Sequence, residues 1–386
     1  MDNQEAVELL QKVIKIPSVA AKEAEVADVL DALAQPYVDA GELTVERLNY
    51  APGRDNLIIK YGPDDAKTKL GIDGHMDVVD PGDPAKWTYD PFAATIKDGK
   101  IYGRGASDMK SGLIAAFVAF LNVVKKHELH DTQLVFFATV GEEVDNYGAR
   151  QLAAGHYVDG LSGILVCEPS STQIEPSCRG IIDYTVTVQG KAAHSSTPEQ
   201  GANAITGLFA YSAAVAPKAA KLCAPDHPML GHATHSITLI NGGNQVNIIP
   251  EAAKLRANIR TTPLADNVAF TKAINAAKDE AAAAHPELHF ELSVDSTIDS
   301  VASSADNHLV QTIQAVRNAQ GLPSLPVKGG TGINDAAVML QPGMDLAEYG
   351  PGNDSSHQTD EYVDIADFTQ AIGLYEKIFS QYGLTY

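Results

Sequence analysis

Apolar residues in the first half of the chain follow two spacings, one typical of helices and one typical of buried strands. Positions three or four residues apart predict surface helices over 4–15 and 21–41, and a nearly continuous apolar run predicts a buried helix over 111–126. Residues 80–100, rich in Pro, Gly and Asp and containing the only tryptophan, Trp87, predict a loop. Strands are predicted at 43–48, 56–61, 69–74, 134–139 and 163–167, with a further helix at about 148–155. Strands that alternate with helices indicate a three-layer α/β domain.

The pattern changes at Gly180, where residues 181–188 alternate between apolar and polar, as in a half-exposed antiparallel strand. From here the predicted order is strand, helix, strand, strand, helix, strand, which is a split βαβ sandwich. The other strands are predicted at 236–240, 253–260 and 288–294, and the helices at 202–216 and 267–284. The α/β pattern then resumes, with helices at 305–320 and 365–382 and a strand at 345–349. We therefore expect an α/β domain formed by residues 1–179 and 296–386, with a second domain, residues 180–295, inserted into it.

The composition agrees with two globular domains and narrows the choice of partner. A chain of 386 residues is too long for one ordinary core. A hydrophobic content of 45% and a charged content of 20% are typical of a soluble globular protein. The formal charge of −21 argues against a nucleic-acid partner or an anionic membrane. It does not argue against an anionic substrate, because a metal site and a few arginines reverse the field locally.

The cysteines and the N-terminus bear on the compartment. Cys167, Cys178 and Cys223 form no CxxC pair and no even framework, which predicts a reducing environment. The first residues are acidic and lack the basic and apolar segments of a secretory signal. No apolar run reaches the roughly 18 residues that a membrane helix needs. We therefore expect a cytoplasmic protein without a membrane partner.

Side chains suited to metal binding follow three of the predicted buried strands at the points where these strands end. They are His75 and Asp77 after the first, Glu142 and Glu143 after the second, and Glu168 after the third. In α/β sheets, ligands bind beyond the carboxyl ends of the strands. His75 and Asp77 are two residues apart, so in an extended chain they point the same way, which suits a metal-binding imidazole held by a carboxylate. The alternative for His75 is a histidine satisfied within the core.

Two further candidates lie in loops. Asp108 stands between a Gly-rich turn and a helix, where a plain helix cap is the alternative, and His357 lies in a turn-rich loop after the last strand. With His75, Glu143 and Glu168 they exceed the three protein ligands of a single catalytic zinc. They suit two metals that share one bridging carboxylate. Asp108 is the natural bridge, because its side chain is the shortest among these acidic candidates. Nitrogen and oxygen ligands without thiolate favour Zn²⁺, with Mn²⁺ or Co²⁺ as alternatives.

The adjacent acids Glu142 and Glu143 are best divided into one ligand and one general base. A base beside two cations takes a proton from the attacking water and passes it to the leaving nitrogen. The alternative is an acidic helix N-terminus. Other motifs are excluded: Gly103-Arg104-Gly105 lacks the third glycine of a dinucleotide loop, and the chain has no Walker lysine motif and no G-x-S-x-G elbow.

Four blocks carry a resemblance: residues 74–79 (GHMDVV), 103–110 (GRGASDMK), 141–143 (GEE) and 168–170 (EPS). In this order they resemble the M20 metallopeptidase family of co-catalytic zinc hydrolases. The resemblance implies a three-layer zinc-hydrolase catalytic domain with an inserted α+β ferredoxin-like domain that serves as lid and dimerisation domain. It also implies a role for each candidate: His75 and Glu168 bind one zinc, Glu143 and His357 bind the other, Asp108 bridges them, Asp77 orients His75, and Glu142 is the general base.

Two blocks of the inserted domain also match. Residues 190–198 and 201–204 resemble the lid motif of the family, which implies that His194 polarises the scissile carbonyl and that the protein forms a homodimer through the lid. Taken alone, His194 fits an ordinary surface histidine. Asn247 and Arg260 resemble lid positions that contact substrate, although Asn247 alone also fits a turn and Arg260 a solvated strand end.

Within the family, residues 329–331, 349–352 and 357–362 resemble the branch of acetylornithine deacetylase and succinyl-diaminopimelate desuccinylase. The resemblance implies an amidohydrolase acting on a small N-acyl amino acid, with N-succinyl-LL-2,6-diaminopimelate of lysine biosynthesis as the first expectation. Acetylornithine deacetylase and an aminopeptidase or dipeptidase are the alternatives. Residues 330–335 depart from the Thr-Ser-Asp form of proteobacterial desuccinylases, which leaves the acyl group open. A non-enzymatic binding protein would lack the base or a ligand, and this chain has both.

Candidates for substrate contact follow from the chemistry of a carboxylate-bearing acyl group. Arg179, Arg260 and Lys328 are able to pair with a substrate carboxylate, with ordinary surface charges as the alternative. Gly330 and Thr331, from the branch motif, are also expected to contact substrate.

Overall fold

The computed structural model of the protein describes residues 1–129, 131–170, 172–330 and 332–384. The chain forms two compact units. The first comprises Met1–Ser177, Ser303–Lys328 and Asn334–Tyr386, and the second comprises Cys178–Ala302 and Gly329–Ile333. The sequence pattern assigns residues 329–333 to the first domain, but in the structure Gly329 donates its backbone N–H to the Met229 carbonyl at 3.3 Å. A contact between segments 100 residues apart leaves no mark on the local pattern.

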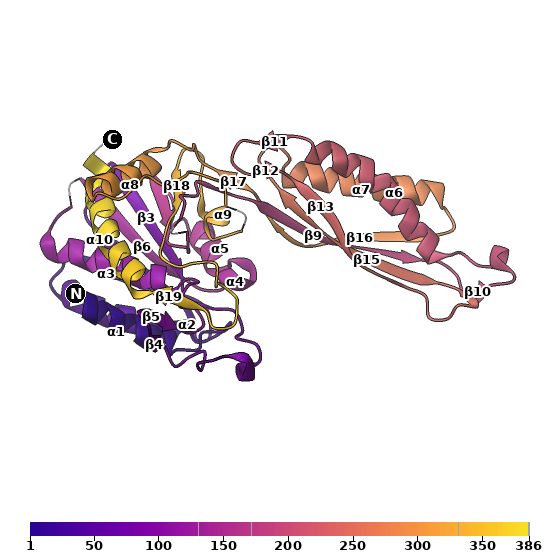
Figure 1. The fold of residues 1–386 in the computed structure, drawn as a ribbon. Helices are drawn as coiled ribbons and strands as arrows, with labels where there is room; N and C mark the ends of the chain where they lie inside the picture. The colour runs from indigo at the N-terminus through magenta and orange to yellow at the C-terminus, as the bar shows by residue number, and fades with distance from the viewer. Residues whose placement is uncertain (130, 171, 331, 385–386) are drawn as a thin grey trace. The chain divides into compact units, whose positions relative to one another are not determined.

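A six-stranded sheet in the order β1-β2-β6-β3-β7-β18 forms the middle of the first unit (Figure 1). Its strands are β1 (Leu43–Ala51), β2 (Arg54–Tyr61), β3 (Thr68–His75), β6 (Thr132–Thr139), β7 (Gly163–Val166) and β18 (Asp345–Glu348). Strand β3 runs parallel to both β6 and β7, and β18 runs parallel to β7. The carboxyl ends of these four strands therefore meet at one edge of the sheet, whereas β1 and β2 are antiparallel additions.

Helices pack around this sheet. They are α1 (Asn3–Ile14), α2 (Glu23–Asp39), α3 (Lys110–Lys126), α5 (Tyr147–Ala154), α8 (His308–Ala319) and α10 (Ile365–Gln381). Helix α3 buries every residue from Lys110 to Val124 because it packs against α1, α10 and β3, as its continuous apolar run predicts. The predicted α/β class is confirmed. None of the helices in the described part of the chain is long and apolar enough to cross a bilayer.

The sequence pattern did not predict several short strands and helices. The predicted loop at 80–100 was wrong at its end, where β4 (Thr95–Lys97) pairs with β5 (Lys100–Tyr102), which in turn pairs with β19 (Tyr362–Asp364). Strands of three residues are too short to show a periodicity. Two single-turn helices, α4 (Glu142–Asp145) and α9 (Ala336–Met339), were missed for the same reason.

The second unit contains an antiparallel sheet in the order β13-β15-β9-β16 with two helices. Its elements are β9 (Gly180–Gln189), α6 (Ala204–Cys223), β13 (Thr234–Gly242), β15 (Ala252–Thr261), α7 (Asn267–Ala284) and β16 (His289–Ile298). The two helices pack on each other, and α6 also packs on β9, β13 and β15. Helix α6 runs past the predicted end at residue 216 and through Pro217, so that Ala219 joins the core.

Candidate metal centre

Three of the candidate side chains meet where parallel strands end. His75 is the last residue of β3, Glu142 opens α4 three residues after β6, and Glu168 follows β7 by two residues. Gly141, between β6 and α4, has φ +72°, and a Cβ there would lie 2.7 Å from the Tyr147 ring. A glycine is therefore needed for the sharp turn that brings Glu142 back over the edge of the sheet.

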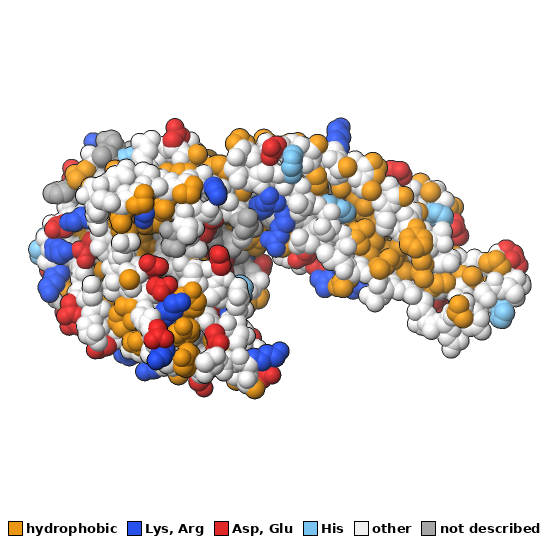
Figure 2. Space-filling view, in the orientation of Figure 1, with side chains coloured by type: hydrophobic (Ala, Val, Ile, Leu, Met, Phe, Trp, Pro, Cys, Tyr) orange, Lys and Arg blue, Asp and Glu red, His pale blue; other side chains and the backbone are white. Residues whose placement is uncertain are grey.

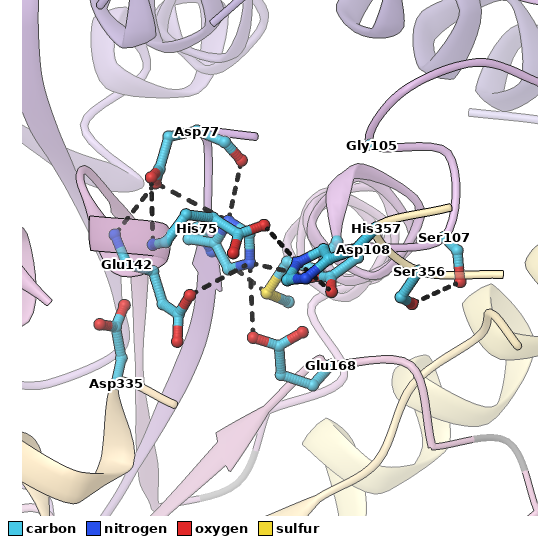
Figure 3. Close-up of polar contacts among 12 residues, drawn as sticks. His75, Asp77, Gly105, Ser107, Asp108, Glu142, Glu168, Asp335, Ser356 and His357 are labelled. Atoms are coloured by element: carbon cyan, nitrogen blue, oxygen red, sulfur yellow. Dashed lines mark hydrogen bonds and ion pairs between the residues drawn. The ribbon is translucent and has the colours of Figure 1, made fainter. Parts of the chain in front are cut away.

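Asp108 lies between the two histidines (Figure 3). Its Oδ1 is 3.2 Å from His75 Nε2, and its Oδ2 is 3.3 Å from His357 Nε2. The His75 side chain is 1% exposed, whereas that of His357 is 53% exposed. One carboxylate thus presents a separate oxygen to each imidazole, which is the geometry of a bridging ligand.

A second carboxylate accompanies each imidazole. Glu168 Oε1 lies 3.4 Å from His75 Nε2, and Glu143 Oε1 lies 3.0 Å from His357 Nε2. Glu142 stands slightly further back, with Oε2 3.9 Å from His75 Nε2. Two sets of possible ligand atoms lie within 4.8 Å of one another: His75, Asp108 and Glu143, and His75, Glu142 and Glu168. The structure therefore brings together all five predicted ligands and the predicted base.

Asp77 contacts this cluster in a way that the sequence did not predict. The nearest acceptor to His75 Nδ1 is the backbone carbonyl of Asp77, at 2.9 Å, while its carboxylate oxygen lies at 3.7 Å. The carboxylate instead accepts the backbone N–H groups of Glu142 and Glu143, both at 3.2 Å. Asp77 thus fixes the tautomer and orientation of His75 through its main chain and the start of α4 through its side chain.

The crowded carboxylates shift one another's protonation. Burial, with the nearby charge of Asp108, raises the pKa of Glu168 to about 8, and burial raises the pKa of Glu142 well above its usual value. Burial alone would raise the pKa of Asp108, but hydrogen bonds from His357 and His75 hold it far below its usual value. Hydrogen bonds to Asp108 and Glu143 raise the pKa of His357 to about 10.

These shifts show what the cluster needs. The raised pKa values of Glu168, Glu142 and His357 reflect how densely negative charge is packed here. Divalent cations bound among these side chains would neutralise that charge. Imidazole nitrogens and carboxylate oxygens suit Zn²⁺, Mn²⁺ or Co²⁺, so the residues of this cluster fit a divalent metal centre.

Two residues around Glu142 were missed at the sequence level. Asn146 Nδ2 donates to Glu142 Oε1 at 3.4 Å and to Asp335 Oδ1 at 3.0 Å. Asp335 Oδ2 accepts the Thr139 hydroxyl at 2.6 Å. Asp335 lies almost 200 residues from its partners in the sequence and follows no strand, so no local signal pointed to it.

The other predicted site residues belong to the second unit, apart from Lys328, whose backbone N–H donates to Ile174 in the first. His194 ends β10 (Ala193–His194), is exposed, and contacts Ser196 Oγ through Nδ1 at 2.8 Å.

The remaining substrate candidates have partners within the second unit. The Asn247 carbonyl accepts the Ser195 N–H at 3.0 Å, and Arg260 lies on β15. Arg179 donates to the Leu230 carbonyl, and Gly330 forms a bridge with Cys178. Thr331 lies outside the described residues.

Comparisons with known proteins agree with this centre. Residues 71–381 match peptidase family M20/M25/M40. A Staphylococcus epidermidis protein named "Probable succinyl-diaminopimelate desuccinylase" is 32% identical, with 99% of this chain and 98% of the relative aligned.

Two solved structures have the same fold. An aminopeptidase from Bacillus cereus has a TM-score of 0.77 at 21% identity, with 99% of each chain covered. A dinuclear metal-binding M20 peptidase from Bacillus subtilis has a TM-score of 0.72 at 15% identity, covering 98% of this chain and 97% of that one. With the family match spanning most of its length, this chain belongs to peptidase family M20/M25/M40 and is a metal-dependent hydrolase.

Proposed function

We propose that the protein is a two-metal amidohydrolase that removes the succinyl group from N-succinyl-LL-2,6-diaminopimelate. The observation that carries the two-metal part is the Asp108 carboxylate, which offers one oxygen to His75 and the other to His357. The substrate rests on the name of the Staphylococcus relative, together with the branch motif of this chain.

The proposed ligand sets follow the pairs of close side chains. His75 and Glu168 would hold one cation, His357 and Glu143 the other, and Asp108 both. Zn²⁺ is the first choice, with Co²⁺ or Mn²⁺ as alternatives. When bound, the cations supply Lewis-acid polarisation of the scissile amide and make an attacking water more acidic.

Glu142 is proposed as the general base. It lies beside the ligands but further from the imidazoles than they do, so it is free to take a proton from water and deliver it to the departing nitrogen. Asp77 holds its backbone N–H, and Asn146 holds its Oε1. These contacts place the carboxylate before substrate arrives, which lowers the cost of orienting it during the reaction.

The lid residues are proposed to act on the substrate. Because the Ser196 backbone N–H donates to His194 Nδ1 at 3.2 Å, a neutral His194 carries its proton on Nε2, where it is available to a carbonyl oxygen. Such a donor would stabilise negative charge that develops on that oxygen. The extra carboxylate of a succinyl group is a partner for Arg179, Arg260 or Lys328. Asn247, Gly330 and Thr331 complete the proposed contacts.

We also propose a homodimer through the second unit. Strand β13 is an edge strand of the four-stranded sheet, and it exposes Ile237, Leu239 and Ile240. Phe209 on α6 is 63% exposed, and Figure 2 shows hydrophobic side chains gathered over the part of this unit that Figure 1 labels α6. An exposed apolar edge strand of this kind is a site for pairing with the same strand of a second copy of the chain. Light scattering would report a dimer, and a monomeric wild-type protein would contradict it.

The substrate is tested by a hydrolysis panel on zinc-loaded protein. The panel compares N-succinyl-LL-2,6-diaminopimelate, N-acetylornithine and a set of dipeptides, each with and without a chelator. We expect chelator-sensitive release of succinate and slow turnover of the others. Preferred cleavage of dipeptides would overturn the desuccinylase proposal in favour of a peptidase, the activity of the Bacillus cereus neighbour.

A further inference from the structure

The buried carboxylate of Glu361 is surrounded by the loop that carries Asp108. Its Oε1 accepts the backbone N–H groups of Ser107 and Asp108 at 2.8 and 2.9 Å. Its Oε2 accepts the Gly105 N–H at 3.1 Å and Arg104 Nη1 at 2.5 Å. The Glu361 side chain is fully buried, and the Arg104 side chain is 3% exposed. Four donors from one short loop therefore converge on a single side chain.

The same carboxylate belongs to the segment that presents the other imidazole. Glu361 follows His357 by four residues, and the two loops make a second contact close by. Ser107 Oγ accepts the Asn353 N–H at 2.9 Å and lies 3.3 Å from Ser356 Oγ (Figure 3). The loop bearing Asp108 and the loop bearing His357, more than 240 residues apart in sequence, are thus joined by two sets of hydrogen bonds, one to Glu361 and one through Ser107.

We infer that Glu361 is a positioning residue, which fixes the bridging oxygen atoms of Asp108 relative to His357 and thereby controls occupancy of the cation position that these two residues share. The inference rests on the proposed two-metal centre. The hydrogen bond from the Asp108 backbone N–H fixes the main chain from which that carboxylate projects. Arg104 balances the buried charge and stacks over Trp87 at 5.2 Å, which keeps its guanidinium in place.

A purely structural tie between the loops would not need a charge. Buried ion pairs add little stability, because desolvation offsets their attraction, and neutral replacements of the same size are often tolerated. By contrast, removing a residue that orients a metal ligand typically lowers metal affinity about 10- to 100-fold. The two roles therefore predict different consequences for the same substitution.

The test is a calorimetric titration of the metal-free full chain with Zn²⁺. The midpoint of thermal unfolding is measured on the same samples. Glu361→Gln keeps the size of the side chain but presents an amide N–H₂ to donors that need an acceptor. The double variant Arg104→Met/Glu361→Gln also removes the charge left unpaired, so it protects the fold. Glu376→Gln is the control. Glu376 is a largely buried carboxylate away from the site, and it accepts hydrogen bonds from Asn122 and Lys126.

We expect the wild-type chain and the control to bind two Zn²⁺ ions. In both Glu361 variants, one of the two sites should weaken by about 10-fold or more. The double variant should recover part of the unfolding midpoint without recovering that site. Unchanged affinity in Glu361→Gln, or affinity that returns together with stability in the double variant, would overturn the positioning role alone. A wild-type chain that binds fewer than two ions would overturn the proposed two-metal centre itself.

Discussion

The carboxylate of Asp77 accepts the backbone N–H of Glu142 at 3.2 Å. Asp77, two residues after the proposed ligand His75, thus holds the main chain of the proposed base, Glu142. The N-terminus of a helix leaves its first N–H groups without partners, and a carboxylate there satisfies them and interacts favourably with the helix dipole. Since Asp77 also contacts His75 through its carbonyl, one residue couples the orientation of a ligand to the placement of the base.

Asp77→Asn should impair turnover without unfolding the protein. An amide keeps one acceptor oxygen but offers N–H₂ to the second backbone donor, which turns α4 away from its place. We expect kcat to fall about 10- to 100-fold, the range typical of contacts that orient metal ligands. Initial rates and metal content measure the effect. Asp80→Asn, at an exposed aspartate three residues on, should leave both unchanged, and equal losses in the two variants would contradict the account.

Glu142→Gln should retain both cations and lose most of its activity. The amide is similar in size but unable to accept a proton, so kcat should fall about 100- to 10,000-fold, as for removal of a general base. The same preparation should bind Zn²⁺ like the wild type, because Glu142 lies outside the two proposed ligand sets. A variant with both ions and full turnover would remove Glu142 from the mechanism.

His357→Ala should lower the Zn²⁺ content from two ions per chain to one. His357 supplies the only imidazole of its proposed set, whereas His75, Asp108 and Glu168 remain for the other ion. Elemental analysis after dialysis gives the stoichiometry. His156→Ala removes an exposed histidine whose partner is Asp159 and should keep two ions. Two ions retained in the His357 variant would show that the second set is wrongly assigned.

Zn²⁺ binding should release protons at pH 7. In the metal-free protein, hydrogen bonds to Asp108 and Glu143 raise the pKa of His357 to about 10, and burial raises the pKa of Glu168 to about 8. Both groups therefore carry a proton at pH 7 that a cation must displace, so affinity should increase as the pH rises toward these values. Calorimetry in two buffers of different ionisation enthalpy counts the protons. Heats that do not depend on the buffer would contradict this expectation.

Much of the first unit could be predicted from the sequence because its main helix and central strands are buried. Helix α3 and strands β6 and β7 contain continuous apolar runs, and the rule that ligands gather beyond strand ends predicted where His75 and Glu168 would meet. The pattern of alternating residues also gave the order of strands and helices in the second unit.

What the sequence did not show depends on distant contacts. Glu361 was visible four residues after His357, yet its role comes from the fold, which wraps the Asp108 loop around it. Asp335 reaches Thr139 from a single-turn helix start that carries no periodicity. For Asp77, two-residue spacing predicted a carboxylate on His75, but β3 ends at His75, so the carbonyl takes that contact.

The most direct test of the two-metal centre is anomalous diffraction at the zinc edge from crystals of the zinc-loaded protein. The account predicts two peaks, one within coordination distance of His75 and Glu168 and the other of His357 and Glu143, with one Asp108 oxygen near each. A single peak, or two peaks that do not share Asp108, would contradict it.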